Sequence, residues 1–581
     1  MKNKTTYIIA TILLIFLFFI SFSSILEDTL TFDETAHVTA GYSYLIKKDM
    51  RVNPEHPPLV KNIAAFPLLF LNLNFPSDSP NWTQEQPPRW WVQFDLANDF
   101  IYNSKNNPDK IMLFSRTVMI LFLLLLGFLI FHFARKKYGN KAGLISLFLF
   151  SFSPTFLAHG RLINTDIGAA FGALLSFYFW LRFFEKPSKK NVLLAGITFG
   201  IALSLKFSLV LLIPTFVIIT LVYALLQEKP FYQLLKYSLL SFLAGVIGMV
   251  FVVFPLYQYH VYNYPPERQA RDAEYILETF GNRTIVNGII YSSEKPFLRP
   301  FAQYFLGLFT AMQRVDGGNT TFFLGEISSG SFKSYFPTVY FIKETLTFHI
   351  LTIISLALLF LYILKYRLFQ RPIYALREYF AEFSMFVFMA IYWYTSINSN
   401  LNIGVRHLLP VFPFAFILVG GAISKINFSK SFKILLFALF SFQIYSVISI
   451  YPHFLAYFNE TVTPQKGHLY VVDSNLDWGQ DLKRLKNLLN EKEIDFIYID
   501  YFGGGNLDYY LGEENYKRWE GLNSPHDFPK GNWLAVSLNQ LQGGRGIPVK
   551  GYDQRTDYYM WLNKYEPSYV IGYSIFLYYV D

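Results

Sequence analysis

YIIATILLIFLFFISFSSIL, residues 7–26, is a run of twenty residues without a charged side chain near the start of the chain. An α-helix of that length spans the ~30 Å hydrocarbon core of a bilayer. The run is too long for the apolar part of a signal peptide, and no cleavage site of small residues follows it. We therefore expect a retained membrane helix.

Similar apolar runs recur along the 581 residues, of which 53% are hydrophobic and 16% charged. A soluble protein carries about 25% charged residues. The sequence predicts a polytopic α-helical membrane protein with about eleven transmembrane helices. There is no cysteine, which excludes disulfides and thiolate metal sites. The predicted helices begin near Tyr7, Ile111, Lys141, Asp166, Val192, Phe207, Leu234, Tyr340, Phe380, Val405 and Ile434.

The basic loops fix the expected orientation, because cytoplasmic loops carry an excess of Lys and Arg. Five such loops fall on the same side as the N-terminal segment Met1–Lys4, so we expect a cytoplasmic N-terminus in a multi-pass cell-membrane protein. The net charge of +9 is concentrated there, and no nucleic-acid partner is expected. The five loops are Arg135–Lys137, Lys186–Lys190, Lys229–Lys236, Lys365–Arg377 and Lys425–Lys433.

The opposite side of the membrane receives the loops 27–110 and 257–339 and everything after about residue 452. We expect a transmembrane domain over residues 1–452 and a small extracytoplasmic α/β domain over residues 453–581. Period-2 apolar patterns predict strands, and one amphipathic pattern predicts a helix over 481–489. The predicted strands are 468–472, 495–499, 533–537 and 569–575.

Residues 59–75 are apolar but interrupted by Pro67, Asn72 and Asn74. The stretch is short for a crossing, and Trp82, Trp90 and Trp91 follow it. Tryptophan is enriched at headgroup depth. We expect an amphipathic helix lying along the outer membrane surface.

Two adjacent carboxylates, Asp33 and Glu34, follow the first predicted span on its outer side. A partly desolvated carboxylate has a raised proton affinity and suits a general base, but an acid before a helix is also a common N-cap. About twenty residues later comes the turn His56-Pro57-Pro58 with Lys61 nearby. Acids and cations beside a membrane suit a substrate with a lipid tail and a charged head.

Further charged residues sit at the outer ends of other predicted spans. Arg161 and Asp166 lie between the third and fourth spans, and Arg406 and His407 lie at the tenth. Asp166 could cap a helix, and Arg116, Lys206 and Arg406 admit both phosphate binding and snorkelling to the headgroups. The stretch from Asp316 to Pro337, with Glu326 and Tyr335, is Gly-rich, which suits either a sugar ligand or a plain turn.

The segment Asp473–Asp481 has oxygen-bearing side chains at alternating positions, as in an EF-hand loop. Its sixth position is Trp478 instead of glycine, and its twelfth is Arg484 instead of an acid. These departures exclude an EF-hand. The segment is more typical of a cap for the following helix, and sugar contact stays open.

Taken together, these segments resemble polyprenyl-phosphate-dependent glycosyltransferases with the GT-C fold, in particular the protein O-mannosyltransferase (family 39) and aminoarabinose transferase group. The aminoarabinose transferases have more spans, so the match is partial at the C-terminal end. The matching segments are Asp33-Glu34, Asn53–Leu59, Ser153–Gly160, Thr165-Asp166, Gly196–Ser208, Leu324–Pro337 and Arg406-His407.

The resemblance implies a role for each matched residue. Asp33 maps to the proposed general base, Glu34 to a supporting acid and Asp166 to the second-loop acid. The family's HPP-type or KPP-type turn supplies a cation near the lipid phosphate, and here that position is His56, followed by Lys61. The expected substrate-binding residues are His56, Lys61, Arg116, Arg161, Lys206, Glu326, Tyr335, Arg406 and His407.

The expected activity is transfer of a sugar from a polyprenyl-phosphate donor to a glycan, lipid or protein hydroxyl on the outer face, with inversion at the anomeric carbon. Cationic side chains would stabilise the leaving phosphate, so no metal cofactor is expected, although Asp33, Glu34 and Asp166 could also collect a divalent ion. Two alternatives are a transporter or flippase of lipid-linked sugars and a glycan-binding membrane scaffold.

Overall fold

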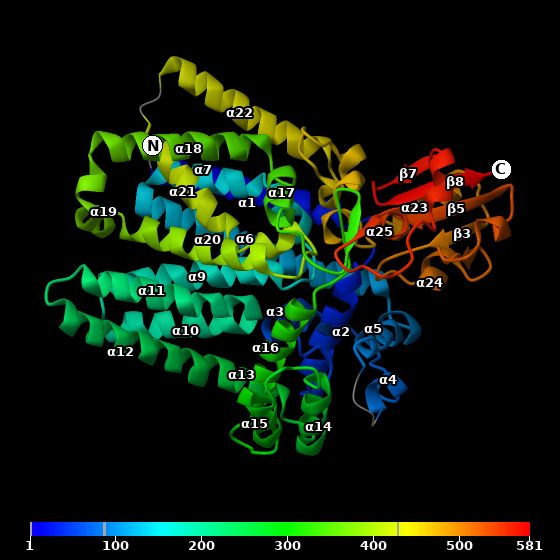
Figure 1. Ribbon diagram of the computed structural model, residues 1–581, viewed down its shortest axis with the longest axis horizontal. Helices are drawn as coiled ribbons and strands as arrows, with labels where there is room; N and C mark the ends of the chain where they lie inside the picture. The colour runs from blue at the N-terminus through cyan, green and yellow to red at the C-terminus, as the bar shows by residue number, and fades with distance from the viewer. Residues whose placement is uncertain (1–2, 85–88, 427–428) are drawn as a thin grey trace.

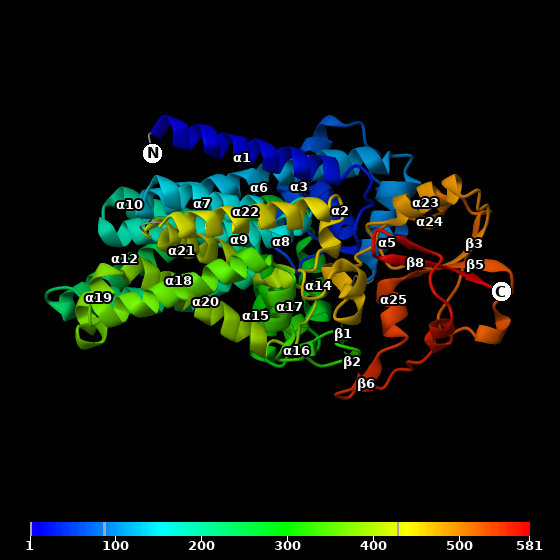
Figure 2. The ribbon, with the colours of Figure 1, turned by 90° about the horizontal axis from the view of Figure 1, so that it is seen from above.

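The computed structural model describes residues 3–84, 89–426 and 429–581. Two parts of the basic segments, residues 1–2 and 427–428, lie outside the described residues. Long helices run along one axis, and the C-terminal sheet lies at one end of them (Figures 1 and 2). The start of α1 and the C-terminus lie at opposite ends of this axis (Figure 1).

Eight helices in the described residues are long and apolar enough to cross a membrane. The other three predicted spans coincide with shorter helices, α7 (Asn140–Ser151), α10 (Lys189–Leu205) and α21 (Phe412–Ser424). The polytopic α-helical fold is therefore confirmed. The eight long helices are α1 (Asn3–Ser24), α6 (Pro108–Tyr138), α9 (Asp166–Glu185), η3–α11 (Phe207–Leu225), α12–α13 (Pro230–His260), α18 (Leu346–Lys365), α20 (Phe380–Asn398) and α22 (Lys430–Ser449).

Two spans begin later than predicted. Near Tyr340 the chain forms a separate short helix, α17 (Tyr335–Ile342), and α18 begins only after Thr345, whose hydroxyl accepts from the Phe348 N–H at 3.3 Å. An N-cap of this kind starts a new helix. At Val405 the chain makes a 3₁₀ turn, η6 (Val405–Leu408), and α21 follows.

The first outer loop is built on α2 (Phe32–Lys47), which packs against α3 (Pro58–Ala65). The sequence starts α2 with a capping box between Thr31 and Glu34 and places Pro58 in the first turn of α3. After α3 and η1 (Phe66–Phe70) the chain turns away without crossing. The Phe66 and Phe70 side chains are 55% and 76% exposed, as expected for a helix at the membrane surface.

The second outer loop is mostly helical and lies beside α2 and α3 (Figure 1). It also carries a short hairpin whose strand β2 pairs in parallel with β6 from the C-terminal part of the chain. The hairpin therefore joins two regions distant in sequence. The elements of this region are α14 (Pro266–Ile276), α15 (Arg283–Ser293), α16 (Arg299–Gly317), β1 (Thr321–Phe323), β2 (Glu326–Ser328) and β6 (Ile547–Val549).

The C-terminal part forms a five-stranded sheet in the order β4-β3-β5-β8-β7, with α23 (Leu482–Glu491) against it. Strand β3 pairs in parallel with β4 and β5, and β8 is antiparallel to β5 and β7. Leu482, Leu485 and Leu489 of α23 are buried in the same core as the sheet. The predicted small α/β unit is confirmed. Its strands are β3 (Ile497–Asp500), β4 (Tyr516–Arg518), β5 (Asn532–Ser537), β7 (Tyr569–Ile571) and β8 (Ile575–Val580).

Two strand predictions in this region are wrong. Residues 468–472 do not form a strand. The 3₁₀ helix η8 (Pro464–Leu469) includes the first two of them, and Val471 makes an isolated bridge to Phe323. The strand predicted over 569–575 is two strands, since Gly572 and Tyr573 both have positive φ and turn the chain between β7 and β8. The remaining short α-helices of the described residues are α4 (Pro80–Thr83), α5 (Val92–Asn98), α8 (Pro154–His159), α19 (Pro372–Glu378), α24 (Leu507–Leu511) and α25 (Leu538–Gly543).

Candidate active site

A cavity of about 490 Å³ lies where the outer segments meet the ends of the spans. It is bordered by α2, the turn after Asn53, η3, α16 and α20, together with the segment leading into η6. Its lining is polar on one part and apolar on another. The polar lining includes Asp33, His37, Asn53, Glu55, His56, Lys206, Arg314, Asp316, Tyr392, Arg406 and His407. The apolar lining includes Phe94, Val210, Leu211, Leu308, Met312, Phe336 and Leu401.

Four of the predicted residues form one chain of ion pairs at this cavity. Asp33, in the first turn of α2 and 27% exposed, places Oδ2 at 3.2 Å from Arg406 Nη1. The same Nη1 is 3.4 Å from Asp166 Oδ2, and Asp166 Oδ1 pairs with Lys206. Segments of chain that are far apart in sequence thus converge on one spot.

Asp166 has a different place from the one predicted. Its side chain is buried and does not belong to the cavity lining, whereas its partners Lys206 and Arg406 do. A carboxylate held between two cations fixes both of them. We therefore correct its role from a catalytic acid to a residue that positions Lys206 and Arg406.

Three histidines line the cavity: His37, His56 and His407. The His37 and His56 rings contact edge to face with centroids 5.2 Å apart. His37 Nδ1 is 3.0 Å from the Ile163 carbonyl, which only accepts, so Nδ1 carries the proton and Nε2 the lone pair. Burial lowers the pKa of both rings below the usual value, although Asp33 opposes this at His37. In the folded protein both act as neutral hydrogen-bonding groups at pH 7.

Lys61 does not reach the cavity, contrary to the prediction that it binds phosphate. It is buried, and its Nζ donates to the backbone oxygen and to Oδ1 of Asn53, both at 2.7 Å, and to Tyr44 Oη at 3.1 Å. Burial lowers the pKa of the ammonium group well below its usual value. Lys61 therefore holds the turn that carries His56.

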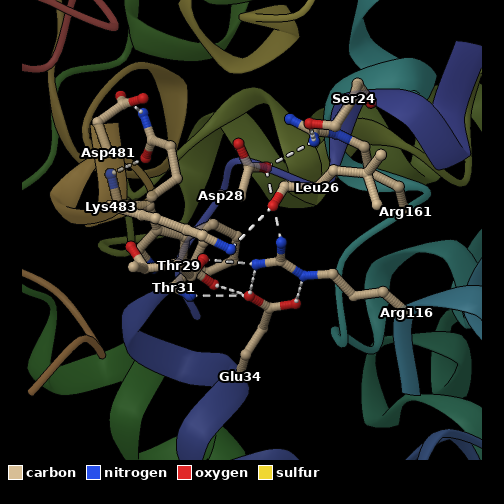
Figure 3. A network of polar contacts seen from close by, with 12 residues as sticks. Ser24, Leu26, Asp28, Thr29, Thr31, Glu34, Arg116, Arg161, Asp481 and Lys483 are labelled. Atoms are coloured by element: carbon tan, nitrogen blue, oxygen red, sulfur yellow. Dashed lines mark hydrogen bonds and ion pairs between the residues drawn. The ribbon is translucent and has the colours of Figure 1, made fainter. Parts of the chain in front are cut away.

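Glu34, Arg116 and Arg161 are also displaced from their predicted roles, because they belong to a buried network away from the cavity (Figure 3). Glu34 accepts from Arg116 Nε at 2.9 Å and Nη2 at 2.5 Å. Arg161 Nη1 donates to Asp28 at 2.6 Å and to the Ser24 carbonyl at 2.8 Å. Their charges are used in holding α1, α2, α6 and the loop before α9 together, so we no longer assign them to catalysis or phosphate binding.

Glu326 and Tyr335 lie outside the cavity as well. Glu326 is the exposed first residue of β2. Tyr335 is buried, and its hydroxyl accepts from Asn475 Nδ2 at 2.8 Å. The neighbouring Phe336 lines the cavity instead. We therefore withdraw the expectation that Glu326 and Tyr335 contact a sugar.

The sequence reasoning missed Arg314 and Glu55, which both line the cavity and pair with each other. Arg314 Nη1 is 3.7 Å from Glu55 Oε2, and its guanidinium lies 5.4 Å from the Trp90 ring centre. Both were within reach of the patterns used: Glu55 lies inside the quoted Asn53–Leu59 motif, and Arg314 stands two residues before the Gly-rich stretch. With Lys206 and Arg406, Arg314 supplies a third cation of the lining.

The segment Asp473–Trp478 was also missed as part of the site. Ser474 Oγ accepts from Arg406 Nε at 3.0 Å, and the Arg406 guanidinium lies 4.3 Å from the Trp478 ring centre. The sequence favoured a helix cap here and left sugar contact open, but it gave no link to Arg406. The sequence signal for this contact is the group of acids, Asp473, Asp477 and Asp481, around Trp478, which the structure shows to be buried.

Asp473 provides a pH-dependent prediction. Burial raises the pKa of Asp473 to about 6, so the folded state binds its proton more tightly than the unfolded state, where a carboxyl titrates near 4. Stability should therefore fall as pH rises from about 4 to about 6. Asp473→Asn cannot ionise and keeps an acceptor for the Ser474 N–H. We expect the variant to be more stable than wild type at pH 7.5, by about 1–2 kcal/mol after allowance for partial exposure, and equal near pH 4.

Melting temperatures of the two proteins in detergent between pH 4 and 8 measure this difference. A gap that does not change with pH would contradict the assignment.

Within the described residues, no group of three or more His, Asp or Glu side chains is arranged to hold a metal ion. Metal independence of the reaction stays a prediction.

Residues 109–257 match the family model described as dolichyl-phosphate-mannose-protein mannosyltransferase. This part of the chain is similar to that family. The match covers about a quarter of the residues, from α6 to α13, and confirms the predicted resemblance there. It indicates a glycosyltransferase in general terms. No curated protein matches the chain.

Three solved structures align along most of the chain. ArnT from Cupriavidus metallidurans bound to undecaprenyl phosphate is 10% identical, with 100% of this chain and 98% of that chain covered and a TM-score of 0.47. Its apo form is 11% identical, with 99% of this chain and 98% of that chain covered and a TM-score of 0.43. The third is the archaeal oligosaccharyltransferase AglB from Archaeoglobus fulgidus, in complex with an inhibitory peptide and a dolichol-phosphate. It is 11% identical, with 91% of this chain and 69% of that chain covered and a TM-score of 0.45.

Proposed function

We propose that this protein is a membrane glycosyltransferase that moves a sugar from a polyprenyl-phosphate carrier to an acceptor hydroxyl on the outer face of the membrane. The observation that carries the proposal is the Asp33–Arg406–Asp166–Lys206 ion-pair chain beside a cavity that is otherwise partly apolar. The family match over residues 109–257 supports the same activity class.

The two-sided lining suits a lipid-linked substrate. Its apolar part comes from η3, where the Phe207–Leu225 span begins, and from the amphipathic helix α16. A polyprenyl tail can lie along these residues while its phosphate reaches Lys206 and Arg406. The cavity therefore offers an apolar site and a cationic site to one molecule. The positive-inside pattern supports an outward-facing site and a cytoplasmic N-terminus.

The chemistry follows from the order of the groups. Asp33 removes the proton of the acceptor hydroxyl while the acceptor oxygen bonds to the anomeric carbon. The bond from that carbon to the phosphate oxygen breaks, and polyprenyl phosphate leaves with the bonding electrons. A single displacement inverts the anomeric carbon. Asp33 is partly exposed, so it can return its proton to water.

The cations act on the leaving group. Lys206, Arg406 and Arg314 face the growing negative charge on the phosphate, and His56 adds a hydrogen-bonding group. Arg406 contacts Asp33 as well as Asp166 in the structure. A phosphate that draws the guanidinium toward itself releases the Asp33 carboxylate for proton transfer. Donor binding and base activation are thereby linked through one side chain.

Lipid that co-purifies with the protein tests the donor class. We expect native mass spectrometry of wild-type protein to show bound polyprenyl phosphate or its sugar ester. Lys206→Ala should carry at least about tenfold less of this lipid. Removal of the ammonium takes one cation from the phosphate site and leaves the charge of the neighbouring Asp166 with one partner fewer, so that it repels the phosphate. Lys295→Ala is the matched control, since Lys295 is an exposed lysine on the outer segments, away from the cavity lining.

Ordinary phospholipid alone on the wild-type protein would contradict the donor assignment. Equal amounts of polyprenyl phosphate on wild type and Lys206→Ala would remove Lys206 from the phosphate site.

A further inference from the structure

We propose that residues 473–478, which lie beyond the last membrane helix, position Arg406 for catalysis, with Trp478 and Ser474 as the positioning residues. The inference rests on the proposed function and deepens it. On this proposal, the segment after the last span is part of the active site. If the segment belonged to a separate acceptor-binding module, it would have no contact with Arg406.

Arg406 is held on three sides. Its Nη1 faces Asp33 and Asp166, its Nε donates to Ser474 Oγ at 3.0 Å, and its guanidinium lies 4.3 Å from the centre of the Trp478 ring. Arginine stacks on aromatic faces and donates in a planar fork, so a ring and a hydroxyl together define its orientation. Both of these contacts come from the 473–478 segment.

The backbone that carries Arg406 is tied to the same segment. Ser474 Oγ donates to the Ile403 carbonyl, and the Val405 N–H donates to Asn475 Oδ1 at 2.9 Å. Between them, Gly404 has φ +148°, and a Cβ there would lie 2.3 Å from Ser474 Oγ. The close approach of the two segments therefore requires glycine at 404.

The segment also contacts the helix that carries Asp33. The N–H of Phe32, the first residue of that helix, donates to the Trp478 carbonyl at 3.0 Å. Just beyond the segment, the Gln480 carbonyl accepts from the N–H of Thr29, which precedes the helix, at 2.8 Å. Phe32 is the residue directly before Asp33. One short stretch of chain thus touches both members of the Asp33–Arg406 pair and can set the 3.2 Å distance between them.

Lys343 anchors this stretch from the transmembrane side. Its buried Nζ donates to the carbonyls of Asn475 at 2.7 Å, Leu455 at 2.9 Å and Tyr457 at 2.5 Å. Three acceptors match the three donors of an ammonium group. The segment is therefore fixed to the membrane part at the same point where it reaches Arg406.

A set of tryptophan variants of the full-length protein tests the assignment. Trp478→Leu should bind undecaprenyl phosphate about 10- to 100-fold more weakly than wild type and form correspondingly less glycan product when it complements a deletion strain. Trp478→Phe keeps an aromatic face for the guanidinium and should recover most of both. Trp519→Leu is the control, because Trp519 is also buried in the C-terminal part but packs on Tyr498 and Phe528.

Melting temperatures of all variants separate positioning from folding. The proposal requires that Trp519→Leu lose stability without a matching loss of lipid binding. Equal losses in Trp478→Leu and Trp519→Leu, or a Trp478→Phe no better than Trp478→Leu, would overturn it while leaving the proposed function in place. Wild-type protein that prefers phosphatidylglycerol to undecaprenyl phosphate would instead overturn the proposed function, and this assignment with it.

Discussion

Replacing Asp33 by asparagine is expected to lower the rate of sugar transfer by about 10²- to 10⁴-fold, the usual contribution of a general base. Asparagine has nearly the same shape but cannot take the acceptor's proton. Arg406 keeps Asp166 as a partner in this variant, so its position should survive. Binding of undecaprenyl phosphate should accordingly stay within a few-fold of wild type. Product formation in a complemented deletion strain and lipid binding by purified protein measure the two effects.

Asp109→Asn is the matched control for this variant. Asp109 is another carboxylate of the outer side, 43% exposed and paired with Lys483 at 3.4 Å, and it does not line the cavity. It should transfer sugar at the wild-type rate. A transporter of lipid-linked sugars, the main alternative from the sequence, has no need of a base at Asp33. Wild-type product levels from Asp33→Asn would therefore exclude the proposed chemistry.

The sequence could predict that several polar residues lie near one another, because their predicted place on one side of the membrane restricts them to a thin layer. These residues are Asp33, His56, Lys206, Arg406 and His407. Each follows or precedes an apolar run on the side opposite the basic loops. Residues at helix ends on one side of a bundle share a thin layer, and the structure places all five on the lining of one cavity.

The same reasoning could not separate cavity charges from buried ones. Arg116 and Arg406 look alike in sequence, as cations near the outer ends of spans, yet one pairs with Glu34 in the interior and the other faces the cavity. Which carboxylate pairs with which arginine depends on how the helices pack. A local signal existed only for Glu34, which stands three residues after Thr31 in a capping-box pattern.

The contribution of Trp478 lay beyond pattern reasoning for another reason. Its contacts with Arg406 and with the residue before Asp33 join positions separated by at least seventy residues, and no helical or strand period relates them. The β-strand predictions of the C-terminal part failed where turn geometry, as at Gly572 and Tyr573, overrode the apolar pattern. Local patterns therefore identified the elements, and tertiary contacts decided their roles.

Glu34→Gln is expected to destabilise the protein by about 3–5 kcal/mol, the cost of leaving one charge of a buried ion pair unmatched. Within the network of Figure 3, Arg116 is 2.5 Å from Glu34 and 3.6 Å from Asp28, so loss of the Glu34 charge leaves its guanidinium with one distant carboxylate. Glu34 also accepts from the backbone N–H groups of Thr31 and Ile163, both at 2.8 Å. Melting temperature in detergent measures the loss.

The double variant Glu34→Gln/Arg116→Gln distinguishes charge imbalance from loss of packing. Removing both partners leaves Asp28 and Asp481 matched by Arg161 and Arg484, so the double variant should be more stable than the sum of the single losses predicts. Asp557→Asn, which breaks an exposed pair with Arg555 at 3.3 Å, should cost no more than about 1 kcal/mol. If Glu34→Gln and Asp557→Asn have the same melting temperature, the buried network does not hold α2. The orientation of Asp33 must then come from the contacts of residues 478–480 alone.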